Sequence, residues 1–104
     1  MKQFTFAYYG EPKFENPQAG MAYKERWMLW MKSLGDAFVN PGVPTKKAKV
    51  VSTGGVSDDA SAPRLTGFSI VKAENMDVAL GMAKTCPHLE HGTLHVAEAM
   101  EMGM

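Results

Sequence analysis

Cysteine is nearly absent from this sequence, because Cys86 is the only one among 104 residues. No intrachain disulfide can therefore form, which is typical of a protein from a reducing compartment, and we expect a cytoplasmic location. The first residues, 1–5, lack the apolar segment of a signal peptide. No apolar run approaches the roughly 18 residues that a membrane-spanning helix needs. We therefore expect no membrane partner.

An excess of charge of either sign is also missing. Eleven basic residues balance eleven acidic ones. A nucleic-acid-binding protein needs a cationic surface that displaces counterions from phosphates, so this balance argues against a nucleic-acid partner. A glycine-rich phosphate loop is absent as well, because Gly54-Gly55 lacks the GxxxxGK[ST] spacing and does not open a helix.

The pattern of apolar residues indicates one α+β domain over residues 1–104. Alternation of apolar and polar residues predicts strands at 3–9, 46–52, 66–73 and 93–98. Apolar residues spaced by three and four predict a helix over 21–39, and a second helix begins after Asn75, a suitable N-cap, and ends before Pro87. The order βαββαβ predicts a ferredoxin-like, four-stranded antiparallel sheet with both helices on one face.

The alternation also assigns two faces to this sheet. The bulky face should pack on the helices: Phe4, Phe6, Tyr8, Phe68, Ile70, Leu94, Val96. The other face is half-polar: Gln3, Thr5, Ala7, Tyr9, Gly67, Ser69, Val71, Thr93, His95, Ala97. We expect a second copy of the chain to cover the half-polar face and to enclose a ligand cavity; the alternative is a sheet face in contact with water.

Histidines supply the candidate chemistry. His95 lies on the half-polar face and His88 near the expected cavity mouth, so both are candidate general acids or bases. The alternative for each is a hydrogen-bonded histidine without a catalytic role. We name Tyr9, Ser69, His95 and Trp30 as candidate ligand-binding residues.

A metal site is the other interpretation of the histidines. Cys86, His88 and His91 resemble a metal-ligand cluster in spacing, but the sequence offers no second pair of ligands elsewhere. We therefore predict no metal and no other cofactor.

Several segments resemble one protein family, the YCII-related family. They are Ser33-Leu34-Gly35-Asp36-Ala37-Phe38, Asn40-Pro41-Gly42, 67–73, 76–84, Cys86-Pro87-His88-Leu89 and 92–96. The resemblance implies a dimeric α+β barrel and covers nearly the whole chain except 53–65. Most members have no assigned activity. Some carry a His-Asp pair proposed to be catalytic, but Trp27 and Cys86 stand at those positions here.

Three functions remain open at this stage. The first is a non-catalytic protein that binds a small molecule or modulates a partner, with the pocket at the sheet face of a homodimer. The second is a cofactor-free acid/base enzyme, of lyase, isomerase or dehalogenase type, acting on a small substrate, aromatic or not. The third is a protein–protein interaction module that uses Trp27 or Trp30 as an exposed anchor.

Overall fold

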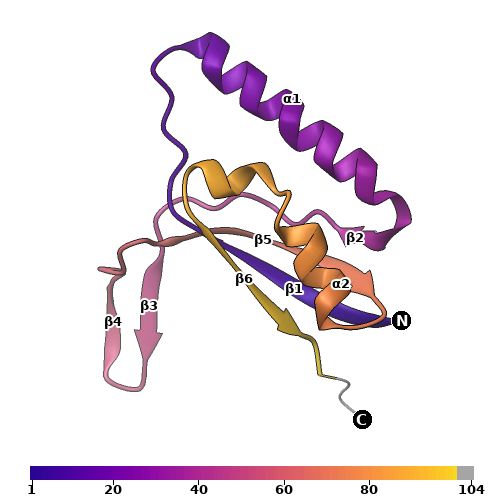
Figure 1. The fold of residues 1–104 in the computed structure, drawn as a ribbon. Helices are drawn as coiled ribbons and strands as arrows, with labels where there is room; N and C mark the ends of the chain where they lie inside the picture. Colours follow the sequence, from indigo (N-terminus) through magenta and orange to yellow (C-terminus); the bar gives the residue numbers. More distant parts are fainter. Residues whose placement is uncertain (101–104) are drawn as a thin grey trace.

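A computed structural model describes residues 1–100 of the chain as an α+β fold (Figure 1). Its elements, in chain order, are β1 (Lys2–Tyr9), α1 (Pro17–Leu34), the 3₁₀ turn η1 (Gly35–Ala37), β2 (Phe38–Asn40), β3 (Lys49–Ser52), β4 (Gly55–Asp58), β5 (Leu65–Ala73), α2 (Met76–Ala83), the 3₁₀ turn η2 (Pro87–Glu90) and β6 (Thr93–Glu98).

The main sheet is antiparallel with the strand order β2-β5-β1-β6. Both helices lie on the same face of it (Figure 1). The predicted ferredoxin-like α+β class is therefore confirmed. No helix within residues 1–100 is long and apolar enough to cross a membrane.

Capping residues fix where the helices begin. The backbone N–H of Ala19 donates to the Asn16 side chain over 2.8 Å, and Pro17 occupies the first turn of α1. Proline is favoured there because that N–H has no partner within a helix. The helix thus begins four residues before the predicted Met21. It ends at Leu34, and Gly35 caps it with a left-handed φ of 55°. Asn75 caps α2 as predicted, accepting from the Val78 N–H over 3.0 Å.

The predicted second strand is wrong in position. Residues 46–52 do not join the main sheet; β3 pairs with β4 in a separate two-stranded sheet that stands apart from the body (Figure 1). The edge strand beside β5 is instead β2. Because α1 ends early, Phe38–Asn40 is free to extend along β5.

The face assigned to β5 is also wrong. Ser69 and Val71 are buried on the helix side, while Phe68 and Ile70 lie on the open face of the sheet. The cause is the register, which places Phe6 opposite Ser69 and Phe4 opposite Val71. Residues directly opposite each other share a face, so the large aromatic side chains of β1 determine that the small ones of β5 lie beside them.

The hydrophobic core is small and lies between the sheet and the helices. Its members, by burial, are Phe4, Phe6, Tyr8, Trp30, Val71, Ala73, Ala79, Ala83 and Cys86. The Phe6 and Trp30 rings stack with centroids 6.3 Å apart. The molecule measures 48 × 41 × 18 Å along its principal axes.

Candidate functional site

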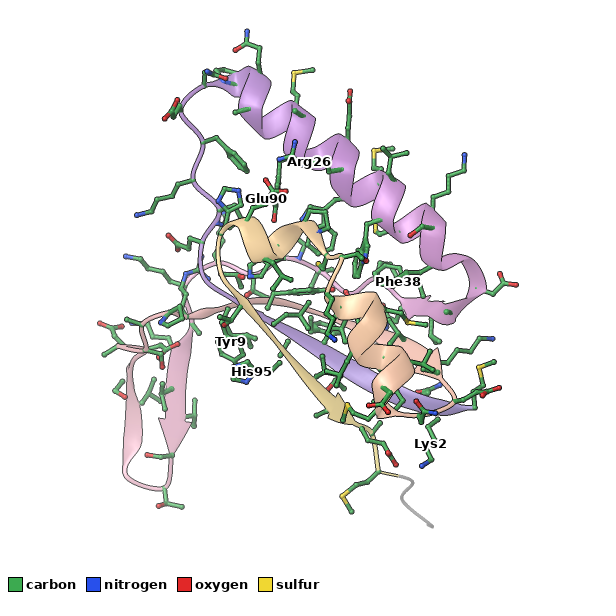
Figure 2. The ribbon with its side chains drawn as sticks, in the orientation of Figure 1. Lys2, Tyr9, Arg26, Phe38, Glu90 and His95 are labelled. Carbon is green, nitrogen blue, oxygen red and sulfur yellow. The ribbon has the colours of Figure 1, made fainter. Side chains whose placement is uncertain are left out.

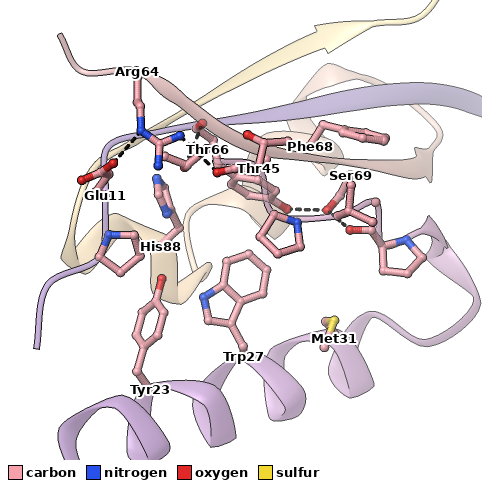
Figure 3. A pocket seen from close by; sticks show the side chains of 17 residues that line it. Glu11, Tyr23, Trp27, Met31, Thr45, Arg64, Thr66, Phe68, Ser69 and His88 are labelled. Atoms are coloured by element: carbon pink, nitrogen blue, oxygen red, sulfur yellow. Dashed lines mark hydrogen bonds and ion pairs between the residues drawn. The ribbon is translucent and has the colours of Figure 1, made fainter. Parts of the chain in front are cut away.

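A cavity of about 540 Å³ lies between α1, the strands β1 and β5, and the loop of residues 41–45 (Figure 3). Its lining combines aromatic rings with a few polar groups. The residues are Tyr8, Glu11, Pro12, Tyr23, Trp27, Met31, Pro41, Gly42, Val43, Pro44, Thr45, Arg64, Thr66, Gly67, Phe68, Ser69 and His88.

One side of α1 supplies an aromatic wall. Tyr23, Trp27 and Met31 are spaced by four residues, so they project from the same side of the helix. The Tyr8 ring meets the Trp27 ring edge to face, with centroids 5.3 Å apart and planes at 76°. This geometry is favourable for aromatic pairs and fixes the Trp27 ring at the cavity surface. The wall is therefore flat, apolar and held in place.

The Tyr23 hydroxyl has no hydrogen-bond partner within residues 1–100, although it is buried. Tyr23 is only 8% exposed, and its hydroxyl points towards the cavity in Figure 3. Burial raises the pKa of this phenol above its ordinary value and outweighs the opposing effect of the nearby Trp27 indole N–H. The hydroxyl hydrogen is therefore present at neutral pH and has no acceptor within residues 1–100. A buried donor without a partner is costly, and it is the kind of group that a ligand oxygen satisfies.

His88 lies on the opposite wall at 2% exposure. Its Nε2 is 2.9 Å from the carbonyl oxygen of Tyr9. Because a carbonyl oxygen only accepts, Nε2 carries the hydrogen, and Nδ1 is left as the nitrogen that can take up a proton. Gly92 permits this arrangement, since a Cβ there would lie 2.0 Å from the Tyr9 carbonyl oxygen and 3.0 Å from Nε2.

A relay of buried hydroxyls crosses the far side of the cavity. The Tyr8 hydroxyl donates to the Ser69 Oγ over 2.8 Å, and Ser69 donates to the Pro41 carbonyl over 2.9 Å. Burial strongly raises the pKa of Tyr8. The relay therefore ties the 41–45 loop to the sheet through neutral groups.

An ion pair forms the end of the cavity near the 59–64 segment. Arg64 Nε donates to Glu11 over 2.5 Å, and its Nη1 donates to the carbonyls of Thr45 and Leu65 over 3.1 and 3.2 Å. The hydrogen bond from Arg64 lowers the pKa of the Glu11 carboxyl, which stays ionised at neutral pH. This end of the cavity is polar, and the middle is apolar.

The residues predicted from the sequence fall on two separate surfaces. His88 and Ser69 line the cavity, Ser69 from the helix side of the sheet and not from the predicted half-polar face. Tyr9 and His95 lie on the open face, as predicted, with ring centroids 4.4 Å apart (Figure 2). Trp30 belongs to the core and does not line the cavity; its indole N–H donates to the Met82 carbonyl and the Thr85 hydroxyl.

Sequence reasoning missed four cavity residues of chemical interest: Tyr23, Trp27 as a cavity wall, Glu11 and Arg64. The four-residue spacing of Tyr23, Trp27 and Met31 could have indicated the cavity wall. A helix with a second apolar side, beyond the one that packs on the core, has two surfaces to cover. Glu11 and Arg64 belong to loops 53 residues apart, and nothing in a single sequence indicates that they meet.

No metal site is evident in the described part of the chain, where no three His, Cys, Asp or Glu side chains are arranged to hold an ion. Cys86 is buried, which raises the pKa of its thiol to about 12. It is therefore a neutral core residue at physiological pH.

Comparison with solved structures reveals one informative likeness. The fold is similar to that of 5-chloro-2-hydroxyhydroquinone dehydrochlorinase (TftG) from Burkholderia phenoliruptrix AC1100 in complex with 2,5-dihydroxybenzoquinone. The TM-score is 0.59, the identity is 17%, and the match covers 97% of this chain and 95% of that one. At such an identity the likeness shows the fold alone. No protein-family model and no curated protein sequence matches the chain.

Proposed function

We propose that this chain is a small-molecule-binding protein of the YCII-related type. Its ligand is a planar ring compound with oxygen substituents, held in the cavity between α1 and the sheet. The observation that carries the proposal is the Tyr23 hydroxyl, which is buried and without a partner at the cavity wall. A ligand oxygen there would accept its hydrogen bond.

The size and lining of the cavity support a ring-shaped ligand. A volume of about 540 Å³ lies within the range of ligand pockets, ~300–1,000 Å³. Trp27 presents an aromatic surface from α1 (Figure 3), and the Tyr8 ring of β1 packs edge to face against it. The structurally similar dehydrochlorinase carries 2,5-dihydroxybenzoquinone, a six-membered ring with oxygen at several positions. That ligand gives the first compound to test.

Calorimetric titration tests the binding proposal. 2,5-Dihydroxybenzoquinone and hydroquinone should bind, whereas 1,4-cyclohexanediol, which is not planar, should not. Tyr23→Phe keeps the ring and removes the hydroxyl, so we expect it to weaken binding by about five- to tenfold, the worth of one hydrogen bond. Trp27→Leu should weaken it further.

His95→Ala is the matched control because it removes a ring from the open face. We expect it to leave binding unchanged. Loss of binding in His95→Ala, with full binding in Tyr23→Phe and Trp27→Leu, would move the site to the open face and reject the cavity. A failure of all planar ring compounds to bind would reject the ligand class.

A catalytic role is the second candidate, and the placement of His88 favours it. The imidazole is fixed at the cavity wall by Tyr9, with Nδ1 as the nitrogen able to take a proton. For a chlorinated hydroquinone, ketonisation of one hydroxyl would first move its proton to the ring carbon that bears chlorine. The base would then remove the proton of the other hydroxyl while the C–Cl bond breaks, so that chloride and one proton leave and a quinone forms. Such proton transfer contributes typically 10²–10⁴-fold to a rate.

Chloride release from a chlorinated hydroquinone measures this activity. We expect His88→Gln to lower the rate by at least about 100-fold. His95→Gln serves as the control because His95 lies on the open face and does not line the cavity. Absence of chloride release by the wild-type chain would reject the catalytic role and leave the binding proposal standing.

We further propose that the chain forms a homodimer through the open face of its sheet. Phe68 and Ile70 lie there beside Ala7, Tyr9 and His95, and nothing in residues 1–100 covers them. The radius of gyration, 15.3 Å, exceeds the ~13 Å expected for a lone compact chain of this length. Analytical ultracentrifugation should find a dimer that Ile70→Glu disrupts and that Leu29→Glu, on the exposed side of α1, does not.

A further inference from the structure

The β3–β4 hairpin exposes three valines to solvent and has no hydrophobic core of its own. All eight residues of its two strands are exposed. Val51 and Val56 lie opposite each other and are 77% and 69% exposed, and Val50 is 44% exposed. The hairpin stands away from the main sheet in Figure 1 and forms its own two-stranded sheet.

A two-stranded hairpin alone is at best marginally stable in water, because it has no face on which to bury apolar side chains. The Lys49–Asp58 ion pair holds the two strands together, but it is exposed and contributes little. Both outer edges of the hairpin also present unpaired backbone groups. The valines and the edges therefore need a cover that the helices and main sheet within residues 1–100 do not supply.

The base of the hairpin is fixed along the edge of β5 in the main sheet. A Cβ at Gly42 would lie 1.8 Å from the Phe68 carbonyl oxygen, so the backbone of this segment touches β5. Pro44 forms a bridge with Gly67, and the Thr45 N–H donates to the Thr66 carbonyl over 2.8 Å. Figure 2 shows Tyr9 and His95 directed away from α1, to the side on which the hairpin projects. The hairpin thus projects from the β5 edge to the side of the sheet on which the open face lies.

We propose that the β3–β4 hairpin is an arm that clasps a second copy of this chain. The inference rests on the proposed homodimer through the open face. At about 3.3 Å per residue, residues 46–52 reach on the order of 20 Å, whereas packed sheets lie only ~10 Å apart. The arm therefore extends past the facing sheet of the second copy, and its valines contact that copy's flank. A two-fold axis gives each copy one arm and one clasped flank.

Photo-crosslinking from the arm tests the contact directly. Val51→Cys introduces an exposed thiol for benzophenone-maleimide, and the native Cys86 is buried. Leu29→Cys is the matched control, since Leu29 is 67% exposed but lies on α1. Mixing unlabelled and ¹⁵N-labelled copies distinguishes crosslinks between copies from those within one. We expect mixed-isotope crosslinked peptides from Val51→Cys and none from Leu29→Cys.

The dimer dissociation constant separates the arm from the sheet face. We expect the double variant Val51→Glu/Val56→Glu to raise it at least tenfold, and Val51→Ile/Val56→Ile to preserve it. An unchanged dimer dissociation constant in Val51→Glu/Val56→Glu, together with no crosslinks between copies, would overturn the arm. The dimer itself would still be supported if Ile70→Glu disrupts it. A wild-type chain that stays monomeric would overturn both the homodimer and the arm.

Discussion

The hydroxyl of Tyr8 donates to the Oγ of Ser69 over 2.8 Å, and both side chains are buried. Ser69→Ala leaves the Tyr8 hydroxyl and the Pro41 carbonyl without this partner, so we expect a loss of ~1–3 kcal/mol in the free energy of unfolding. Tyr8→Phe removes the donor but leaves the Ser69–Pro41 bond, so its cost should be smaller, ~0.5–1.5 kcal/mol. Urea denaturation measures both. The reverse order would contradict the relay.

A pair of glycine substitutions tests the close contact between the 41–45 loop and β5. Gly42 has a φ of 66°, and a Cβ there would collide with the Phe68 carbonyl. Gly42→Ala should therefore cost more than ~1 kcal/mol and displace the loop from the cavity. Gly81→Ala is the control, because a Cβ in this part of α2 meets nothing within 4 Å and should stabilise by ~0.5–1 kcal/mol. Thermal unfolding of both variants suffices; equal stability in the two would be inconsistent with the close contact.

Stability at alkaline pH should depend on Cys86. Burial raises the pKa of this thiol to about 12, whereas an unfolded thiol titrates near about 8.5. The contribution of this thiol to the free energy of unfolding is therefore fully present below about pH 8.5. It is lost as the pH rises towards 12, by up to ~1.4 kcal/mol per pH unit. Cys86→Ala should show a shallower decline between about pH 8.5 and 10, below the range in which tyrosines contribute. Parallel slopes for the two proteins would refute this role.

The opposite pH dependence should come from Arg26 and Glu90, which join α1 to η2 (Figure 2). Arg26 donates to both carboxylate oxygens of Glu90 over 3.0 and 2.7 Å, and this lowers the pKa of Glu90. The stabilisation is present above the unfolded pKa of about 4.3 and disappears as the pH falls. Glu90→Gln should melt slightly below the wild type at pH 7, and the gap should close near pH 3. Both side chains are half-exposed, so added salt should also narrow it.

The fold class follows from local signals that the sequence contains in full. Phe4, Phe6 and Tyr8 alternate on a long strand, and Asn75 is a good helix cap. These features depend only on neighbours in the chain, so the pattern predicts them correctly. The antiparallel sheet then follows from the order of the elements.

The face of β5 could not be read from the sequence, because it depends on register with another strand. Phe68 and Ile70 are the more apolar residues, but the aromatic residues of β1 require small side chains opposite them. The cavity was missed for a related reason. Its walls meet only after α1, β5 and the 41–45 loop pack, and the loop's position depends on contacts such as that of Gly42 with Phe68.

The small size of the hydrophobic core has a consequence for how the molecule melts. A sheet that packs helices on only one face buries little apolar surface, so a large share of the free energy of unfolding would come from whatever covers the other face. If a second copy of the chain covers that face, dimerisation stabilises the folded state by mass action, and the melting temperature should rise with protein concentration. Dilution would then act on this chain as a mild denaturant.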